Sequence, residues 1–252
     1  MHDIAIGCAG WSIPREHREQ FGAGESVLAR YATRFAVVEI NSSFYRAHRQ
    51  STYARWAATV PPHFRFSVKL PKAISHDMAL RGSGSALDRF LDEIAGLGGN
   101  LGGVLLQLPP SQSFDMRVAS NFFRMFRRRS QAPLACEPRH ASWFSSKANA
   151  LFQRHGVSRV TADPSIGSGS DAPWLEQSSP YWRLHGKPRI YYSPYPEEAL
   201  HEIAGALTVR RPSALAPWII FDNTAHGFAV RDAARLQDIL HAMTRDEARK
   251  PR

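Results

Sequence analysis

The chain has 252 residues, of which 43% are hydrophobic and 21% are charged, a composition that is ordinary for a globular protein. Its length fits one large α/β domain or two small ones. No apolar run approaches the roughly 18–20 residues that span a bilayer, and the first residues lack the basic and apolar regions of a signal peptide. We therefore expect a cytoplasmic protein without a membrane partner.

The formal net charge is +10 and the isoelectric point is near 10.1. Most of this charge comes from arginine, because only five residues are lysines. Such basicity favours phosphate-bearing partners, nucleic acid included. Arginine is also scattered along predicted helices, where it forms solvated faces, so the charge alone does not choose a function.

Short apolar segments bounded by turn residues recur along the chain and alternate with amphipathic stretches. The predicted strands are residues 4–11, 36–42, 65–71, 102–109, 133–139, 158–164, 181–186 and 217–223. The predicted helices are residues 25–35, 51–60, 85–98, 116–128, 145–156, 196–207 and 234–245. Residues 165–180 are predicted to form a long loop instead of a helix.

Eight strands with mostly helical connections predict a single (β/α)8 TIM barrel, whose usual size is about 250 residues. A doubly wound open sheet is the alternative. It would favour GxGxxG after the first strand, where the chain has GCAGWS. We expect one barrel domain over residues 1–245 and a basic, disordered tail over residues 246–252.

The two cysteines, Cys8 and Cys136, form no CxxC pair and no Cys/His spacing for a metal. They fall on the first and fifth strands, which lie on opposite sides of an eight-stranded barrel. We therefore expect two unpaired core residues and a reducing compartment.

Side chains two apart on a strand point the same way, so the apolar residues of each strand reveal which polar ones face the barrel axis. Val38 and Ile40 are expected to face the helices, which leaves Glu39 and Asn41 inward. In the sixth strand Val160 is assigned to the helix side. The same alternation predicts further inward polar side chains on five other strands: Lys69, Gln107, Glu137, Arg139, Asp163, Arg183 and His185. On the eighth strand it does not choose between Asp222 and Asn223.

This polar set lies near the carboxyl ends of the strands, the face where barrel enzymes place their chemistry. A single inward pair can be a satisfied ion pair. Polar groups on six strands at once are costly unless compensated, and such clusters mark functional sites. The sequence therefore predicts a binding or catalytic pocket at this face.

Several blocks of the chain resemble the YecE-like family, also called domain of unknown function 72. They are GCAGW, VEINSSFYR, FRFSVKLPKAISHD, LGGVLLQLPPS, CEPRHASWF, TADP, YWRLHG and FDN, in that order over roughly residues 4–240. Two departures are visible, since Cys8-Ala9 and Asp222 stand where the family more often has Thr-Ser and Asn. The resemblance implies a TIM barrel and a cytoplasmic protein, and it implies no particular reaction.

A carboxylate base beside cations suits proton abstraction, or hydrolysis of a phosphate-bearing or sugar-like substrate. Glu137 is the leading acid/base, ionised by Arg139, in a metal-independent hydrolase, lyase or isomerase. The predicted catalytic residues are Glu137, Lys69, His185 and Glu39. The predicted substrate-binding residues are Asn41, Tyr45, His76, Gln107, Arg139, Asp163, Arg183 and Asn223.

Four other readings stay open, and so does the oligomeric state. A divalent metal could be held by carboxylates and a histidine, as in sugar isomerases or apurinic endonucleases of this fold. The residues of this set are Glu39, Glu137, Asp163 and His185. The positively charged side chains on the intervening strands would repel such a metal ion. Lys69 could act as a Schiff-base nucleophile. The protein could bind or process nucleic acid, or bind a small molecule without turnover. If the partner is nucleic acid, the predicted phosphate contacts are Lys72, Arg81, Lys187 and Arg189.

Overall fold

The computed structural model describes residues 4–166, 180–209 and 217–249. Its strands are β1 (Ala5–Cys8), β2 (Val37–Ile40), β3 (Arg65–Lys69), β4 (Leu101–Gln107), β5 (Leu134–Glu137), β6 (Val157–Arg159), β7 (Thr161–Asp163), β8 (Tyr181–Leu184) and β9 (Trp218–Phe221). Each lies within one residue of a predicted strand or inside it. Most of the strands are shorter than predicted, and backbone hydrogen bonds such as that from the Asp222 N–H to the Leu184 carbonyl continue the pairing beyond them.

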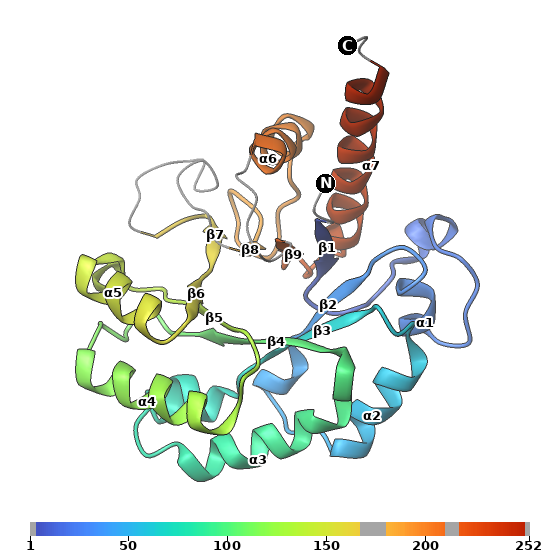
Figure 1. The fold of residues 1–252 in the computed structure, drawn as a ribbon. Coiled ribbons are helices and arrows are strands. Elements are labelled where there is room, and N and C mark those ends of the chain that lie inside the picture. The colour runs from blue at the N-terminus through green and yellow to red at the C-terminus, as the bar shows by residue number, and fades with distance from the viewer. Residues whose placement is uncertain (1–3, 167–179, 210–216, 250–252) are drawn as a thin grey trace.

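All strand pairs are parallel, and they form two sheets, β1-β9-β8-β7 and β2-β3-β4-β5-β6 (Figure 1). The sheets approach each other at β1 and β2, where Ala9 forms a parallel bridge with Glu39. Gly7 permits this approach, since a Cβ there would lie 2.1 Å from the Val37 carbonyl oxygen. The arrangement is a TIM-barrel-like α/β fold, as the sequence predicts.

The predicted sixth strand is divided between the two sheets. Its first part, β6, pairs with β5, and its second part, β7, pairs with β8. Val160 lies between the two parts, and its backbone N–H donates to the Cys136 carbonyl at 2.8 Å. The same segment thus belongs to both sheets, which is why nine strands occupy eight predicted positions. The predicted loop that follows lies almost entirely outside the described residues.

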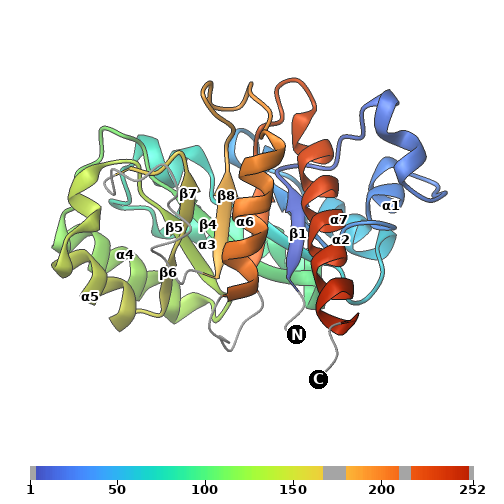
Figure 2. The ribbon, with the colours of Figure 1, turned by 90° about the horizontal axis from the view of Figure 1, so that it is seen from above.

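The helices are α1 (Val27–Tyr31), α2 (Gln50–Thr59), α3 (Gly84–Ile94), α4 (Met116–Arg129), α5 (Ser146–Arg154), α6 (Glu197–Val209) and α7 (Phe228–Arg249). Helices α2 to α5 lie outside the five-stranded sheet, while α6 and α7 lie side by side against the other sheet (Figures 1 and 2). Within the described ranges, no helix is long and apolar enough to cross a membrane.

Helix α7 continues through residues 246–249, which the sequence analysis assigned to a disordered tail. Glu247, Ala248 and Arg249 are strong helix formers, which explains why the helix continues to Arg249. The last three residues of the predicted tail lie outside the described ranges.

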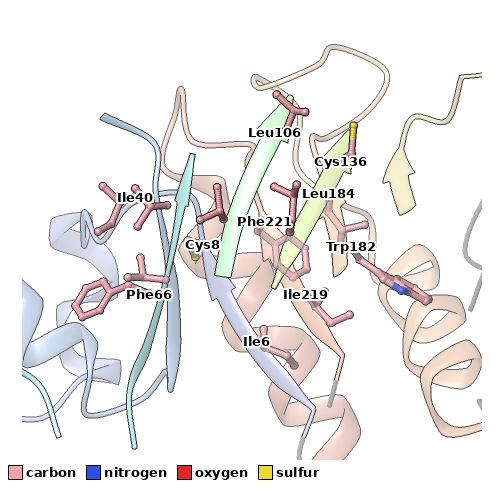
Figure 3. Close-up of a cluster of buried hydrophobic side chains, with 14 of the residues drawn as sticks. Ile6, Cys8, Ile40, Phe66, Leu106, Cys136, Trp182, Leu184, Ile219 and Phe221 are labelled. Atoms are coloured by element: carbon pink, nitrogen blue, oxygen red, sulfur yellow. The ribbon is translucent and has the colours of Figure 1, made fainter. Parts of the chain in front are cut away.

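An apolar layer fills the space between the strands and the surrounding helices. Figure 3 shows part of it, including Ile40, Phe66, Leu106 and Trp182. Cys8 and Cys136 belong to this layer, and both are buried and free, which confirms that they do not pair. The residues predicted to face the helices therefore do so on every strand for which the alternation made a choice, except the sixth.

A second, smaller apolar cluster lies inside the barrel, mostly toward the amino ends of the strands. Its buried members are Ala9, Val37, Leu105, Ala135, Val160, Tyr181 and Ile220. Trp218 packs against this cluster, and a Cβ on Gly102 would lie 2.4 Å from its ring, so only glycine fits there. The polar residues considered below follow these apolar ones along the same strands.

Candidate functional site

Arg183 of β8 is fully buried inside the barrel and binds three carboxylates. Its Nε and Nη2 donate to the two oxygens of Glu39, at 2.9 and 2.7 Å. Its Nη1 donates to Glu137 Oε2 at 2.6 Å, and Nη2 also donates to Asp222 Oδ2 at 2.8 Å. The three carboxylates are themselves at most 2% exposed as residues. One guanidinium therefore links strands β2, β5 and β8 with the residue that follows β9.

His185 lies between two of these carboxylates. Its Nε2 is 2.9 Å from Glu137 Oε1, and its Nδ1 is 3.1 Å from Asp222 Oδ2. Burial works to lower the pKa of His185, but the charge of Glu137 and the hydrogen bonds to both carboxylates outweigh it and raise the pKa. The imidazole therefore holds its proton at a higher pH than an exposed histidine does, and both ring nitrogens then donate.

Glu137 is held as a carboxylate by this arrangement. Burial favours its neutral form, yet Arg183 first, and then His185 and Arg139, bring its pKa well below the usual range. Arg139 Nη1 donates to Glu137 Oε1 at 3.0 Å, and Gln107 Nε2 donates to the same oxygen at 3.3 Å. The predicted pair of Glu137 and Arg139 thus forms at the end of β5, and Gln107 of the neighbouring strand joins it.

The hydroxyl of Tyr181 donates to Glu39 Oε2 at 2.9 Å, a contact that the sequence analysis missed. Tyr181 is buried and lies two residues before Arg183 on the same strand, so the spacing that predicts an inward Arg183 also predicts an inward Tyr181. The phenol completes the hydrogen bonds of a carboxylate that already binds Arg183 through both oxygens.

Lys69, the last residue of β3, also faces the barrel interior and is 4% exposed. It lies opposite Leu105 of the interior cluster in the β3–β4 register. Its Nζ is 4.2 Å from the centre of the Phe44 ring. Burial first, and then the charge of Arg183, lower its pKa, although the surrounding carboxylates act in the opposite direction.

Asp163 does not face the barrel interior, which corrects the orientation expected for the sixth strand. Val160 and Ala162 pack in the interior cluster, so Asp163 points to the helix side. There it accepts a hydrogen bond from the Tyr195 hydroxyl at 2.7 Å and lies 3.5 Å from Lys187 Nζ. The apolar Val160 and Ala162 pack in the interior because the neighbouring interior side chains are themselves apolar, so apolar character did not identify the helix side of this strand.

On the eighth predicted strand, Asp222 and not Asn223 is the residue that faces the barrel interior. Asp222 binds Arg183 and His185, whereas the Asn223 amide donates to Asp232 Oδ2 of α7 at 2.7 Å and to the Ser193 carbonyl at 3.0 Å. Asn223, a predicted substrate-binding residue, is fully buried outside the ionic cluster. Its described contacts attach the start of α7 and the loop before α6 to the end of β9.

Asn41, Tyr45 and His76 lie on the segments that follow β2 and β3. The Asn41 side-chain oxygen is buried and accepts no hydrogen bond from the described residues. The Tyr45 side chain is 76% exposed and touches the edge of the Phe44 ring. His76, whose ring centre is 5.0 Å from that of Phe44, is partly exposed. Phe44 thus connects Lys69 with both predicted binding residues.

A cavity of ≈ 250 Å³ adjoins His76. It is bounded by the turn after β3, the loop after β4 and the start of α4. Arg81, Gln112 and Trp143 contribute to its lining. Lys69 and Phe44 do not line this cavity; Phe44 adjoins it only through its ring contact with His76.

The four side chains considered as metal ligands do not converge. Glu39 and Glu137 both bind Arg183, which occupies the space between them, and Asp163 faces the helix layer. In the part of the chain that the structure describes, no group of three or more His, Cys, Asp and Glu side chains is arranged to hold a metal ion.

The cations predicted as phosphate contacts at the barrel mouth mostly have acidic partners. Lys72 pairs with Asp77 at 3.0 Å, and Arg81 pairs with Asp115 at 3.2 Å. Lys187 lies near Asp163, as described above, and Arg189 packs over the ring of Tyr192. Their positive charge is thus largely compensated within the chain.

Fold and site together define a TIM-barrel-like α/β protein with a buried ionic cluster at the carboxyl ends of its strands. A family model described as "Protein of unknown function DUF72" matches residues 5–252. The chain therefore belongs to the DUF72 family, as the sequence blocks indicated.

Curated relatives agree with this assignment. UPF0759 protein YecE of Escherichia coli K12 is 35% identical over 166 residues, which cover 64% of this chain and 59% of that protein. The aligned part thus spans less than two thirds of that relative. UPF0759 protein YunF of Bacillus subtilis strain 168 is 21% identical over 268 residues, which cover 94% of each chain.

Solved structures share the fold. A DUF72 family protein from Enterococcus faecalis V583 superimposes with a TM-score of 0.78 at 21% identity, covering 95% of this chain and 96% of that one. A DUF72 family protein from Thermotoga maritima MSB8 gives 0.77 at 22% identity, covering 95% and 100%. The 3-keto-L-gulonate-6-phosphate decarboxylase of Vibrio cholerae gives 0.53 at 8% identity, covering 95% and 98%, a likeness of fold alone.

Proposed function

We propose that the protein is an enzyme that binds a small anionic molecule, phosphate-bearing or sugar-like, at the carboxyl ends of its strands. The observation that carries this proposal is a set of polar groups with unused hydrogen-bonding capacity beside a saturated ionic cluster. The groups are the Lys69 ammonium, the Arg139 guanidinium and the Asn41 amide.

The charge balance of the cluster supports an anionic ligand. Three carboxylates belong to it, and Arg183, Arg139 and protonated His185 together balance them. When Lys69 is protonated, its ammonium is the additional positive charge. An anion that joins the cluster restores neutrality in a region from which water is largely excluded, where charge pairs interact strongly.

Arg139 is the group best suited to contact the ligand. Its side chain is 13% exposed, whereas that of Arg183 is completely covered. One of its N–H groups donates to Glu137, and the others have no acceptor among the described residues. A guanidinium with free N–H groups binds a carboxylate or phosphate through two parallel hydrogen bonds, which fixes the orientation of the ligand.

The acid/base roles differ from those first expected, because Glu137 and His185 are saturated by hydrogen bonds. Glu137 has a strongly lowered pKa and four donors around it, so we assign it the role of a fixed negative charge that holds Arg139 and His185. Lys69 has a lowered pKa and no hydrogen-bond partner among the described residues, so we assign its amine as the reactive group of the site.

Thermal unfolding in inorganic phosphate tests the anion site. The midpoint of the wild-type protein should rise with phosphate concentration relative to chloride of equal ionic strength, because a ligand bound only by the folded state stabilises it. Arg139→Gln should lose most of this rise. Arg128→Gln, which removes an exposed arginine of α4 that makes no described contact, should keep it. An equal rise in wild type and Arg139→Gln, or no rise in wild type, would contradict the proposal.

A further inference from the structure

We infer that Lys69 is a nucleophile that forms an imine with a carbonyl carbon of the substrate, which makes the substrate an anionic aldehyde or ketone such as a 2-oxo acid. This inference rests on the proposed function and specifies its substrate class. It is carried by the environment of the amine and by the way the nearby carboxylates are occupied.

The environment of Lys69 is unusual for a buried lysine. Lys72 and Lys187 each have a carboxylate within salt-bridge distance, but Lys69, although 4% exposed, has neither an ion pair nor a hydrogen bond among the described residues. Its Nζ instead lies over the Phe44 ring. A buried ammonium without a carboxylate partner is costly, and the loss of its proton relieves that cost.

The nearby carboxylates do not provide this missing partner because other cations occupy them. Glu39 binds Arg183 through both oxygens, and Asp222 binds Arg183 and His185. Burial and the charge of Arg183 consequently lower the pKa of Lys69. This arrangement increases the fraction of neutral amine, the form that attacks a carbonyl carbon.

The ≈ 250 Å³ cavity available for the rest of a substrate is lined by His76 and not by Lys69, and the Phe44 ring lies in contact with both side chains. The unpartnered oxygen of Asn41 follows β2, the strand paired with β3, and can accept a hydrogen bond from a hydroxyl or iminium N–H. The free N–H groups of Arg139 suit the anionic group of the same substrate.

The chemical step needs no further reactant. The lone pair of Lys69 Nζ forms a bond to the carbonyl carbon, and a proton moves from nitrogen to oxygen to give a carbinolamine. The C–O bond then breaks, the oxygen takes up a second proton and leaves as water, and a protonated imine remains. That cation can accept the electron pair of a C–H or C–C bond broken next to it, which fits an isomerase or a lyase.

Reductive trapping tests this inference directly. The protein is incubated with pyruvate, reduced with sodium borohydride and analysed by intact mass and peptide fragmentation. We expect one added pyruvate, less one water and plus two hydrogens, on Lys69. Lys69→Met and Lys69→Arg should both lose the adduct, the second while keeping a positive charge. Lys147→Met, which removes an exposed lysine of α5, should keep it.

The outcomes separate this inference from the anion site. If phosphate still raises the unfolding midpoint but pyruvate, glyoxylate and dihydroxyacetone phosphate leave no adduct on Lys69, the imine is wrong and the anion site stands. An adduct spread evenly over the exposed lysines, and unchanged in Lys69→Arg, would also refute the imine. If Lys69 is trapped although phosphate has no effect, the carbonyl chemistry holds and the proposed phosphate affinity fails.

Discussion

The two halves of the barrel interior are built from the same strands but are held together differently. Toward the amino ends the interior side chains are apolar, as with Ala135 of β5 and Ile220 of β9. Two residues further along, the same strands present Glu137 and Asp222. Hydrophobic contacts in the first half tolerate many partners, whereas each charge in the second half requires a particular one. The need for particular interaction partners therefore lies at the carboxyl ends of the strands.

The largest effect should follow removal of the shared cation. Arg183→Met leaves three buried carboxylates without their common partner, and breaking one buried ion pair already costs about 3–5 kcal/mol. We expect the free energy of unfolding, measured by urea denaturation at neutral pH, to fall by at least that amount. The loss should shrink as the pH is lowered, because protonation relieves the uncompensated carboxylates.

Leu105→Ala is the matched control from the apolar half. It should cost about 2–5 kcal/mol through lost burial and the cavity left behind. No charge is altered, so this loss should vary little with pH. If the two variants show the same pH dependence, the contrast between the halves is wrong.

A smaller effect is expected from His185, and it has a defined direction with pH. Its folded-state pKa is raised above the ordinary value of about 6.5, so its contribution to stability is complete below that pH and is lost as the pH rises through the folded-state pKa. The pKa values of Glu137 and Asp222 are lowered, so their contribution is present above about pH 4 and is lost at lower pH.

His185→Gln should therefore lack the decline in stability on the alkaline side of pH 6.5 that the wild type shows. The measurement is the free energy of unfolding across a pH series. His63→Gln, at an exposed position, serves as the control and should follow the wild type. A wild-type profile that stays flat over this range would mean that His185 is neutral inside the cluster.

The smallest effect should have the opposite sign. Lys69→Met removes a buried amine without a partner and leaves an apolar side chain beside Phe44, so we expect a gain of about 0.5–2 kcal/mol in the free energy of unfolding. A residue that lowers stability in this way is retained for its function. A loss of stability, as in Arg183→Met, would instead make Lys69 a structural cation.

The two-residue alternation of the strands made most of the site predictable. It correctly placed Glu39, Lys69, Glu137 and Arg183 inside the barrel, because each lies between residues that are clearly apolar. It failed at Asp163, where the neighbouring side chains suit either face and the strand divides between two sheets.

Other features could not be predicted from local patterns. The assignment of three carboxylates to one guanidinium depends on the register of strands far apart in the chain, which alternation does not encode. Asn223 is the second residue after β9, and its amide donates to Asp232 of α7 instead of reaching the barrel interior. The inward orientation of Tyr181, by contrast, could have been predicted from the same two-residue alternation.

The bond between Arg183 and Glu39 also bears on how the chain reaches its native state. The two residues are 144 positions apart, and they belong to different sheets. Contacts of such long sequence separation form late, because the entropy of closing the intervening loop must first be overcome. If only one of the two sheets were folded, its charged residues would lack their counter-ions, so neither sheet is expected to be stable alone. Completion of this ionic link makes assembly a single cooperative event.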